Sequence, residues 1–373
     1  MPGQAALQGK PAAAPVLAAA PRAGSRGALA CLGWAGLAAI AAFALLALQP
    51  EPVPPPLEGT TQFRLPDGRL LAYDVRGKWE SAQHAAFWLH GIISSRYEAM
   101  STELEVLHAL DLVLIGVDRP GYGASTRDPH RSFQTFAKDL TALAESLGIF
   151  SFFVVGVSGG GPYALAAAHY LPPGRVRGVL TISSPAPAGL MTPGERAEWD
   201  RRVGPATAAF ASLYRRHEAV ARAVRDWALT RTGGWALFWT VLRPLALNAK
   251  RTMAHVDVAC LDNDHPEYFQ AIVPESLRQR SGAPLFEDLA IFLGEAWAYN
   301  VSSVSPQLAA ATHFWHGTGD LQVPDVSSRA LHRLLPGSSL TVVPGGGHFS
   351  YYVCHATTQR TALSRMLVSA AAA

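Results

Sequence analysis

Short apolar runs separated by helix-like stretches are the feature that most restricts the fold of this chain. Six such runs, rich in Val, Leu, Ile and aromatic side chains, begin near residues 85, 112, 152, 176, 312 and 339. They lack a steady alternation with polar residues, which is typical of strands buried on both faces. Helix-like stretches lie between several of them, notably at 133–147 and 162–171. The alternation predicts an α/β protein with a mostly parallel central sheet flanked by helices.

Two further stretches complete the expected domain. Residues 63–77 predict two strands around a Pro66-Asp67-Gly68 turn. Between the runs at 176–183 and 312–317 lie about 125 residues with little strand character and helical patches at 193–216 and 235–249. An excursion this long predicts an inserted helical cap. We place the core at 61–185 and 306–373 and the cap at 186–305. The cap contains an apolar stretch at 233–247, which we interpret as a lid helix packed on the core rather than a lipid-facing surface.

The first 60 residues differ in composition from the remainder. The tail at 1–27 has Lys10, Arg22 and Arg26 and no acidic residue, and the segment 28–48 is uncharged and hydrophobic. As a helix this segment would span about 30 Å, the hydrocarbon thickness of a bilayer. We expect a single membrane anchor with the tail in the cytoplasm, followed by a Pro-rich linker at 49–60. Its high alanine content leaves open a cleaved signal or transit peptide, and then a secreted or organellar protein.

The sequence Gly156-Val157-Ser158-Gly159-Gly160 lies where an apolar run meets a helix-like stretch. The motif GxSxG alone is weak evidence for a catalytic serine, but its position between an expected strand and an expected helix is informative. A tight turn of small residues there would present the Ser158 hydroxyl at the carboxyl edge of the sheet, near the amides of a helix N-terminus. We therefore predict that Ser158 is a nucleophile.

A serine nucleophile requires a base, an orienting acid and donors for the oxyanion. Asp320 and His348 each follow a later apolar run, in the chain order that this turn requires. His348 would take the Ser158 proton and return it to the leaving group, while Asp320 would fix the imidazole tautomer. We predict the backbone amides of Ile92 and Gly159 as the oxyanion donors. Other acids left open are Asp325, Asp262 and Asp264.

Several other residues are assigned structural roles. We expect Asp118 and Arg119 to order the loop after a strand, and His90 to shape the turn before Ile92. His265 lies near two aspartates, but we interpret this group as a polar cap loop, so no metal and no cofactor is expected.

Cysteine number and overall charge exclude other classes. Cys31, Cys260 and Cys354 are odd in number and far apart, so we predict neither a disulfide nor structural zinc, and we interpret Cys354 as a packing residue. A net charge of +3 without a Lys/Arg run argues against a nucleic-acid partner.

The segments WLHGIISS, GVDRPGYGAST, GVSGGGPYALA, HGTGDLQVP and GGGHFS follow the motif order of the α/β-hydrolase superfamily. Over about 60–370 the chain resembles its fold-1 group, and it is similar to plant members with a hydrophobic N-terminal segment. The resemblance implies hydrolysis of an ester-like bond through an acyl-enzyme on Ser158. Epoxide hydrolases and haloalkane dehalogenases have aspartate at this position, so the resemblance argues against both.

The preferred hypothesis is an esterase- or lipase-like serine hydrolase acting on a small-molecule ester with an apolar portion. Two alternatives stay open at this point: a receptor that binds a small molecule in the same pocket without turnover, and a peptidase or amidase of the same fold.

Overall fold

The computed structural model describes residues 54–372, with gaps at 129, 204–207, 209–210, 213–216, 218–222, 224–225, 228–229, 244–246, 252 and 294–296. The predicted tail, hydrophobic segment and first linker residues (1–53) lie outside the described residues. The chain divides into units 1–49 and 50–373, and the second unit is described here by itself. Within the described residues, no helix combines the length and the apolar character needed to cross a bilayer.

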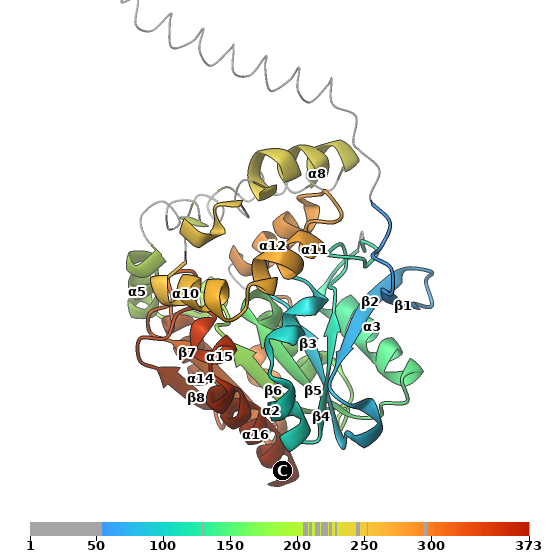
Figure 1. The fold of residues 1–373 in the computed structure, drawn as a ribbon. Coiled ribbons are helices and arrows are strands. Elements are labelled where there is room, and N and C mark those ends of the chain that lie inside the picture. Colours follow the sequence, from blue (N-terminus) through green and yellow to red (C-terminus); the bar gives the residue numbers. More distant parts are fainter. Residues whose placement is uncertain are drawn as a thin grey trace, which may run out of the picture. The chain divides into compact units, whose positions relative to one another are not determined.

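An eight-stranded sheet forms the centre of the unit (Figure 1). Its strands are β1 (Thr61–Arg64), β2 (Leu70–Arg76), β3 (His84–Leu89), β4 (Leu112–Val117), β5 (Phe152–Val157), β6 (Val176–Ile182), β7 (Thr312–Gly317) and β8 (Ser339–Val343). The order across the sheet is β1-β2-β4-β3-β5-β6-β7-β8. Every predicted strand is present, including the pair around the Pro66-Asp67-Gly68 turn.

The sheet is parallel except at one edge. β1 pairs antiparallel with β2 and β2 with β4, whereas β3 to β8 run parallel to their neighbours. β4, β5 and β7 are buried at every residue, as their continuous apolar runs predict. Because the parallel strands all end at the same edge, the loops that follow β3, β5 and β7 meet there.

Alternate residues of the strands supply two separate cores. Phe87 and Leu89 of β3 belong to one core, with side chains from α3, α4 and α14, while Trp88 belongs to the other, with side chains from α2 and α16. This is the two-residue period of a strand with helices on both faces. The core helices are α2 (Leu104–Ala109), α3 (Phe133–Ser146), α4 (Gly161–Tyr170), α14 (Val326–Leu334), α15 (Ser350–Val353) and α16 (Ala356–Ala372), with short 3-10 turns at η1 (Trp79–Ser81), η2 (Arg96–Ser101) and η3 (Ser158–Gly160).

The described residues between β6 and β7 form helices, turns and loops, which confirms the inserted helical cap. In Figure 1, α8, α11 and α12 lie beyond one end of the sheet. The cap contains α5 (Pro193–Val203), α8 (Arg231–Leu237), α10 (His255–Asn263), α11 (Val273–Ser276) and α12 (Ala283–Leu293), the π-helices η5 (Phe238–Leu242) and η7 (Tyr268–Ile272), and the 3-10 turns η4 (Ala188–Leu190), η6 (Ala249–Arg251) and η8 (Val301–Ser303). The short helix α13 (Pro306–Ala310) follows in the core, where it contacts β6 and α16.

The cap helices differ from their predicted bounds. The patch expected at 193–216 contains α5 (Pro193–Val203), and residues 204–207 after it lie outside the described part of the chain. The patch expected at 235–249 begins earlier, as α8 at Arg231. Thr230 explains that start, because its side chain accepts a hydrogen bond from the Gly233 amide and caps the helix. Trp235 and Phe238 in the apolar stretch are buried, as expected for packing on the core, whereas others remain exposed.

Candidate active site

The turn after β5 has the backbone of a strained elbow. Ser158 has a φ of 48°, in the left-handed region that side chains other than glycine rarely adopt. It begins the 3-10 turn η3, and α4 follows directly. A Cβ at Gly160 would lie 1.9 Å from the Leu89 carbonyl oxygen, so only glycine permits this approach to β3. Gly160 is therefore required by close packing.

Asp320 and His348 form a buried pair. Asp320 Oδ2 accepts a hydrogen bond from His348 Nδ1 at 2.6 Å, and both side chains are almost completely buried. Burial alone would raise the pKa of Asp320, but the charge of His348 and the hydrogen bonds from His316 and His348 lower it below its usual range. Burial lowers the pKa of His348, but the charge of Asp320 and its hydrogen bond outweigh this, and the pKa lies above 6.5. With Nδ1 donating to the carboxylate, Nε2 is the nitrogen available as a base.

Three further donors hold the Asp320 carboxylate. Oδ1 accepts from the amides of Gln322 and Val323 at 2.8 and 2.9 Å, and Oδ2 accepts from His316 Nε2 at 3.1 Å. His316 is fixed in turn, because its Nδ1 lies 2.6 Å from the Ser328 hydroxyl. His316 was missed in the sequence, although its position at the end of β7, four residues before the acid, is a usable signal.

The alternative acid Asp325 instead pairs with Arg202 and Arg329.

Ser158 and His348 line one pocket, although no hydrogen bond joins them. Such hydrogen bonds are often long in unliganded enzymes. The cavity measures about 270 Å³, and its remaining lining is mostly apolar and comes from core loops and cap alike. The other lining residues are Gly91, Ile92, Ile93, Met253, Tyr268, Val273, Leu285, Leu289, Gln322, Val323 and Phe349.

The predicted oxyanion loop lies beside the nucleophile. A Cβ at Gly91 would lie 3.3 Å from the Ser158 Cβ, which brings the backbone before Ile92 against the elbow, where Gly159 directly follows Ser158. His90 shapes the turn, since its Nδ1 donates to the Gly91 carbonyl at 2.7 Å and its Nε2 accepts from the Arg119 amide at 3.1 Å. Burial, and then the charge of Arg119, hold the pKa of His90 well below 6.5, which suits this neutral tautomer.

A buried carboxylate behind this loop was missed in the sequence. Glu98 of η2 accepts hydrogen bonds from the Gly91 amide, the Trp88 indole N–H and the Ser94 hydroxyl. Burial raises its pKa to about 7, although these hydrogen bonds oppose the change. Glu98 therefore holds the loop that carries Ile92, and it can take up a proton near neutral pH.

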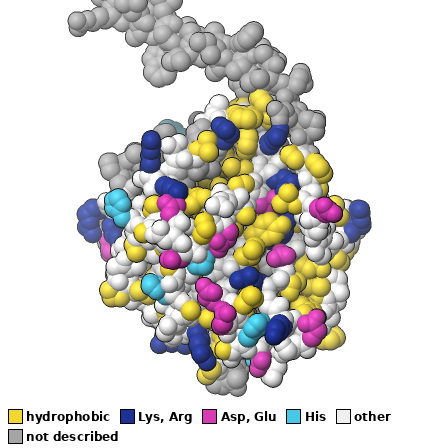
Figure 2. All heavy atoms as spheres, in the orientation of Figure 1, with side chains coloured by type: hydrophobic (Ala, Val, Ile, Leu, Met, Phe, Trp, Pro, Cys, Tyr) yellow, Lys and Arg dark blue, Asp and Glu magenta, His cyan; other side chains and the backbone are white. Residues whose placement is uncertain are grey.

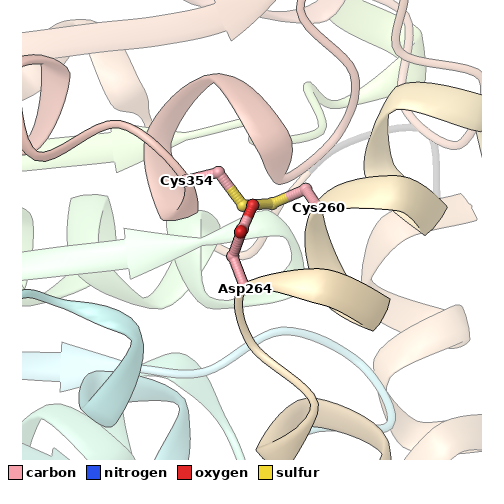
Figure 3. Close-up of side chains that lie close together, drawn as sticks. All are labelled: Cys260, Asp264 and Cys354. Atoms are coloured by element: carbon pink, nitrogen blue, oxygen red, sulfur yellow. A yellow bond between two sulfur atoms is a disulfide. The ribbon is translucent and has the colours of Figure 1, made fainter.

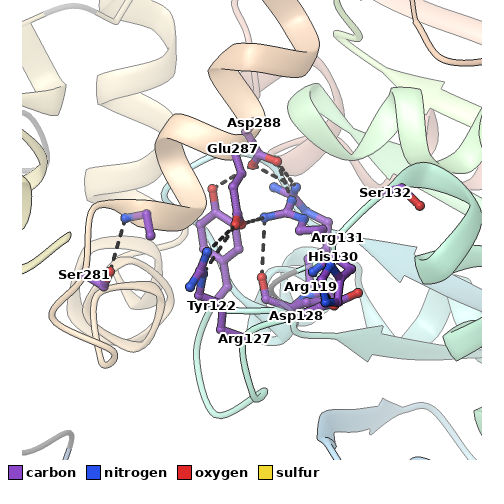
Figure 4. Close-up of polar contacts among 12 residues, drawn as sticks. Arg119, Tyr122, Arg127, Asp128, His130, Arg131, Ser132, Ser281, Glu287 and Asp288 are labelled. Carbon is purple, nitrogen blue, oxygen red and sulfur yellow. Dashed lines mark hydrogen bonds and ion pairs between the residues drawn. The ribbon is translucent and has the colours of Figure 1, made fainter. Parts of the chain in front are cut away.

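Buried ion pairs connect the cap to the loops around the site (Figure 4). Arg119 Nη1 lies 2.8 Å from both oxygens of Asp288 on α12, and Arg131 also pairs with Asp288. The other guanidinium nitrogens of Arg119 donate to the carbonyls of His90 and Gly91. The cap is thereby tied to the loop that carries the predicted oxyanion donor Ile92.

A second link lies nearby. Arg96 Nη1 contacts Asp118 and, at 2.6 Å, Glu275 of α11. Asp118 also accepts from the amides of Arg96 and Ala124. Neither Asp118 nor Arg119 lines the pocket of Ser158, so both have the structural roles expected of them.

The prediction that no disulfide forms was wrong. Cys260 of α10 and Cys354, which ends α15, are joined by a disulfide (Figure 3). They are 94 residues apart in sequence, so only the packing of the cap against α15 brings them together. Asp264 lies close to both sulfurs, but in the disulfide these sulfurs are not thiolate ligands. His265 pairs with Glu267, whereas Asp262, which the sequence placed in a loop, lies on α10 and pairs with Lys250.

Comparisons with known proteins agree with this architecture. A family model described as alpha/beta hydrolase fold matches residues 88–353. No curated protein sequence matches the chain. Similar solved structures include a thermophilic esterase from Thermogutta terrifontis, 21% identical with a TM-score of 0.54 and covering 83% of this chain and 98% of its own. A bromoperoxidase from Bacillus anthracis is 18% identical with a TM-score of 0.56, covering 83% and 100%.

An esterase from Exiguobacterium antarcticum is 17% identical with a TM-score of 0.51, covering 84% of this chain and 99% of its own. At these identities the solved structures show a shared fold and no particular reaction. The family model, in contrast, spans most of the chain and includes β5, the elbow, the cap and His348. The chain therefore belongs to the alpha/beta hydrolase fold family.

Proposed function

We propose that this protein is a serine hydrolase that cleaves carboxylic esters through an acyl-enzyme on Ser158. The observation that carries the proposal is the buried Asp320–His348 pair, which lines the same apolar cavity as a serine held on a strained elbow. That two of the similar solved structures are esterases adds support.

In the proposed reaction, Ser158 Oγ attacks the ester carbonyl carbon while His348 Nε2 takes its proton. The negative charge that develops on the carbonyl oxygen is stabilised by the amides of Ile92 and Gly159. The imidazolium, held by Asp320, then protonates the leaving alcohol as the C–O bond breaks. Water, deprotonated by His348, releases the acid and restores Ser158.

The cavity supports a short apolar acyl group as the preferred substrate portion. Its volume of about 270 Å³ is below the range of about 300–1,000 Å³ that holds drug-sized ligands. Its walls include Met253, Leu285 and Leu289. With nitrophenyl esters of increasing chain length, we expect kcat/KM to be highest for short chains and to fall for long ones.

Fluorophosphonate labelling tests the reaction class. The intact protein should be labelled at Ser158, and Ser158→Ala should lose labelling and lower kcat by about 10⁴- to 10⁶-fold. Retained esterase activity in Ser158→Ala would refute the proposal. Saturable ligand binding without product would indicate a receptor instead, and cleavage of amides in preference to esters would indicate a peptidase.

We further propose that residues 28–48 anchor the protein in a membrane, in keeping with the resemblance to plant members that have such a segment. Exposed apolar side chains in the cap support this: Trp239 is 38% exposed, Val241 40% and Leu247 69%. Hydrophobic side chains gather at the α8 end of the molecule in Figure 2.

The linker meets this part of the cap. Pro54 lines one groove with Phe238, and the Pro55 carbonyl accepts a hydrogen bond from Arg278 at 2.6 Å. The Cys260–Cys354 disulfide favours an oxidising compartment, as expected for a domain on the non-cytoplasmic side. Resistance to carbonate extraction and an intact N-terminus by mass spectrometry would support an anchor. A new N-terminus beyond residue 48 would instead indicate a cleaved targeting segment.

A further inference from the structure

Asp257 holds the backbone of the proposed base from the cap side. It is a fully buried residue in the first turn of α10. Its Oδ2 accepts a hydrogen bond from the His348 amide at 2.7 Å, and its Oδ1 accepts from the amides of Phe349 and Ser350, both at 2.9 Å. Charge-assisted hydrogen bonds of this kind fix direction as well as satisfying buried donors. One cap carboxylate therefore orients three consecutive peptide groups, beginning with that of His348.

Gly347 shows how closely this carboxylate approaches. A Cβ on Gly347 would lie 2.3 Å from both carboxylate oxygens of Asp257, closer than atoms can approach without a bond. The glycine before His348 thus makes room for the cap carboxylate. This is a more specific reason than the loop flexibility that a glycine run suggests.

His348 is held on three sides by different parts of the chain. Its amide donates to Asp257 of the cap, and its carbonyl accepts from the Ser183 hydroxyl, at the end of β6, at 2.8 Å. Its imidazole donates to Asp320. Because both neighbouring peptide groups are fixed, the direction of the side chain, and with it the place of Nε2, depends on cap and core together.

The disulfide joins the same helix to the far end of the same segment. Cys260 lies three residues after Asp257 on α10, hence on the same face of the helix. It is bonded to Cys354, six residues after His348. Helix α10 therefore holds the segment 348–354 at both ends, by a carboxylate at one and a covalent bond at the other.

We propose that helix α10, through Asp257 and the Cys260–Cys354 disulfide, positions the imidazole of His348 for catalysis, so that the oxidation state of a cap disulfide regulates the enzyme. The proposal rests on the proposed serine hydrolase function and adds its regulation. Asp257 is a positioning residue, because it lies outside the lining of the Ser158 pocket and acts through the amides of 348–350.

The charge of Asp257 gives this role a distinctive signature. Three acidic groups face His348: Asp320 after β7, Asp257 on α10 and Glu98 on η2, and their charges raise its pKa against the effect of burial. The other titratable neighbours are Tyr268 and Tyr351, whose pKa values burial raises well above 10, and His316, which contacts Asp320. Neutralising Asp257 should therefore lower the pKa of His348, a change that looser packing alone would not produce.

Asp257→Asn tests the positioning role. The amide retains one acceptor oxygen but turns an N–H₂ group toward at least one backbone N–H, so the segment must shift. A displacement of about 1 Å near reacting groups can cost about 100-fold in rate. We expect kcat to fall about 10- to 100-fold per fluorophosphonate-titrated site, with KM little changed, and the acidic limb of kcat/KM to move to lower pH. Wild-type kcat with an unmoved limb would overturn the proposal.

Asp262→Asn is the matched control. Asp262 lies on the same helix, but it is exposed and pairs with Lys250. This variant should retain wild-type kcat and pH dependence. An equal loss in both variants would show that any charge change on α10 disturbs the cap, which would contradict a specific role for Asp257.

Reduction tests the disulfide. A dithiol supplies two electrons and two protons, breaks the Cys260–Cys354 bond to give two thiols, and becomes a cyclic disulfide itself. We expect reduction to lower kcat several-fold, reoxidation to restore it, and the double variant Cys260→Ser/Cys354→Ser to have the lower kcat and no response to dithiol. Unchanged wild-type kcat after reduction confirmed by thiol counting would refute the regulatory part.

An NMR titration of the His348 imidazole in the full chain separates this proposal from the reaction itself. Asp257→Asn should lower the His348 pKa and shift its Nδ1–H resonance even if the protein hydrolyses no ester. Absence of ester turnover and of Ser158 labelling would refute the proposed function, whereas an unchanged His348 titration in Asp257→Asn would refute the positioning role.

Discussion

Replacing Glu98 by glutamine should alter how folding stability depends on pH. In the folded protein, burial raises the pKa of Glu98 from 4.5 to about 7. The folded state therefore binds this proton more tightly than the unfolded state does. Ionising Glu98 consequently destabilises the fold, and the free energy of unfolding falls as the pH rises between 4.5 and 7. At about 1.4 kcal/mol for each pH unit, this interval corresponds to about 3 kcal/mol.

Glutamine suits the site well enough to isolate the charge. Its carbonyl oxygen can accept from the Trp88 indole and the Gly91 amide, which both bond to Oε2 of Glu98, and its N–H₂ can donate to the Ser94 hydroxyl. Relative to wild type, Glu98→Gln should therefore gain up to about 3 kcal/mol between pH 4.5 and pH 8.

Urea unfolding at several pH values measures this difference, because every other titrating group is common to both proteins. Glu105→Gln, a change at an exposed residue of α2, serves as the control and should follow the wild-type curve. If the free energies of unfolding of wild type and Glu98→Gln ran parallel from pH 4.5 to 8, the assignment of a buried, proton-binding carboxylate behind the oxyanion loop would be refuted.

Two other outcomes follow from the site and the cap. Because the pKa of His348 lies above 6.5, kcat/KM should be lost as the pH falls through an acidic limb above 6.5. Asp320→Asn should move this limb of the pH profile to lower pH and lower kcat by about 10⁴-fold. An unmoved limb in this variant would contradict the pairing of Asp320 with His348. Asp288→Asn removes the charge facing Arg119 and Arg131 and should lower the free energy of unfolding, measured in urea, by about 3–5 kcal/mol. Glu195→Gln, at the exposed pair with Arg333, should lower it by less than about 1 kcal/mol. Equal losses in the two variants would contradict the larger contribution to stability assigned to the buried cluster.

The sheet was predictable because its information is local. Each buried strand is a short apolar run, and the elbow at Ser158 has small residues at the positions where the backbone turns. The strands, their mostly parallel arrangement and the edge that carries Ser158 could therefore be predicted from general rules, whereas their order across the sheet was not predicted. Asp320 could be placed after its strand and was the preferred acid, but the sequence left Asp325 open as an alternative. Only the fold distinguishes the two acids, because Asp325 forms ion pairs with arginines, whereas Asp320 accepts a hydrogen bond from His348.

Contacts between cap and core were not predictable in this way. Asp257 meets the amide of His348 across 91 residues, and Arg96 meets Glu275 across 179. Neither separation in sequence follows the period of a helix or a strand, because the packing of the intervening helices determines which of their faces contact the core. The same cause produced the error at Cys260 and Cys354, whose separation in sequence says nothing about the distance between α10 and α15.

The buried links between cap and core bear on how the protein unfolds. Within the described residues, α10, α11 and α12 are each tied to a core loop, through Asp257, Glu275 and Asp288 respectively. Opening any one of these links leaves a buried charged or hydrogen-bonding group without its partner, so partial detachment of the cap is disfavoured. Cap and core should thus melt as one cooperative unit, and a cap grafted from a relative would function only if it brought its own partners for Arg96, Arg119 and the His348 amide.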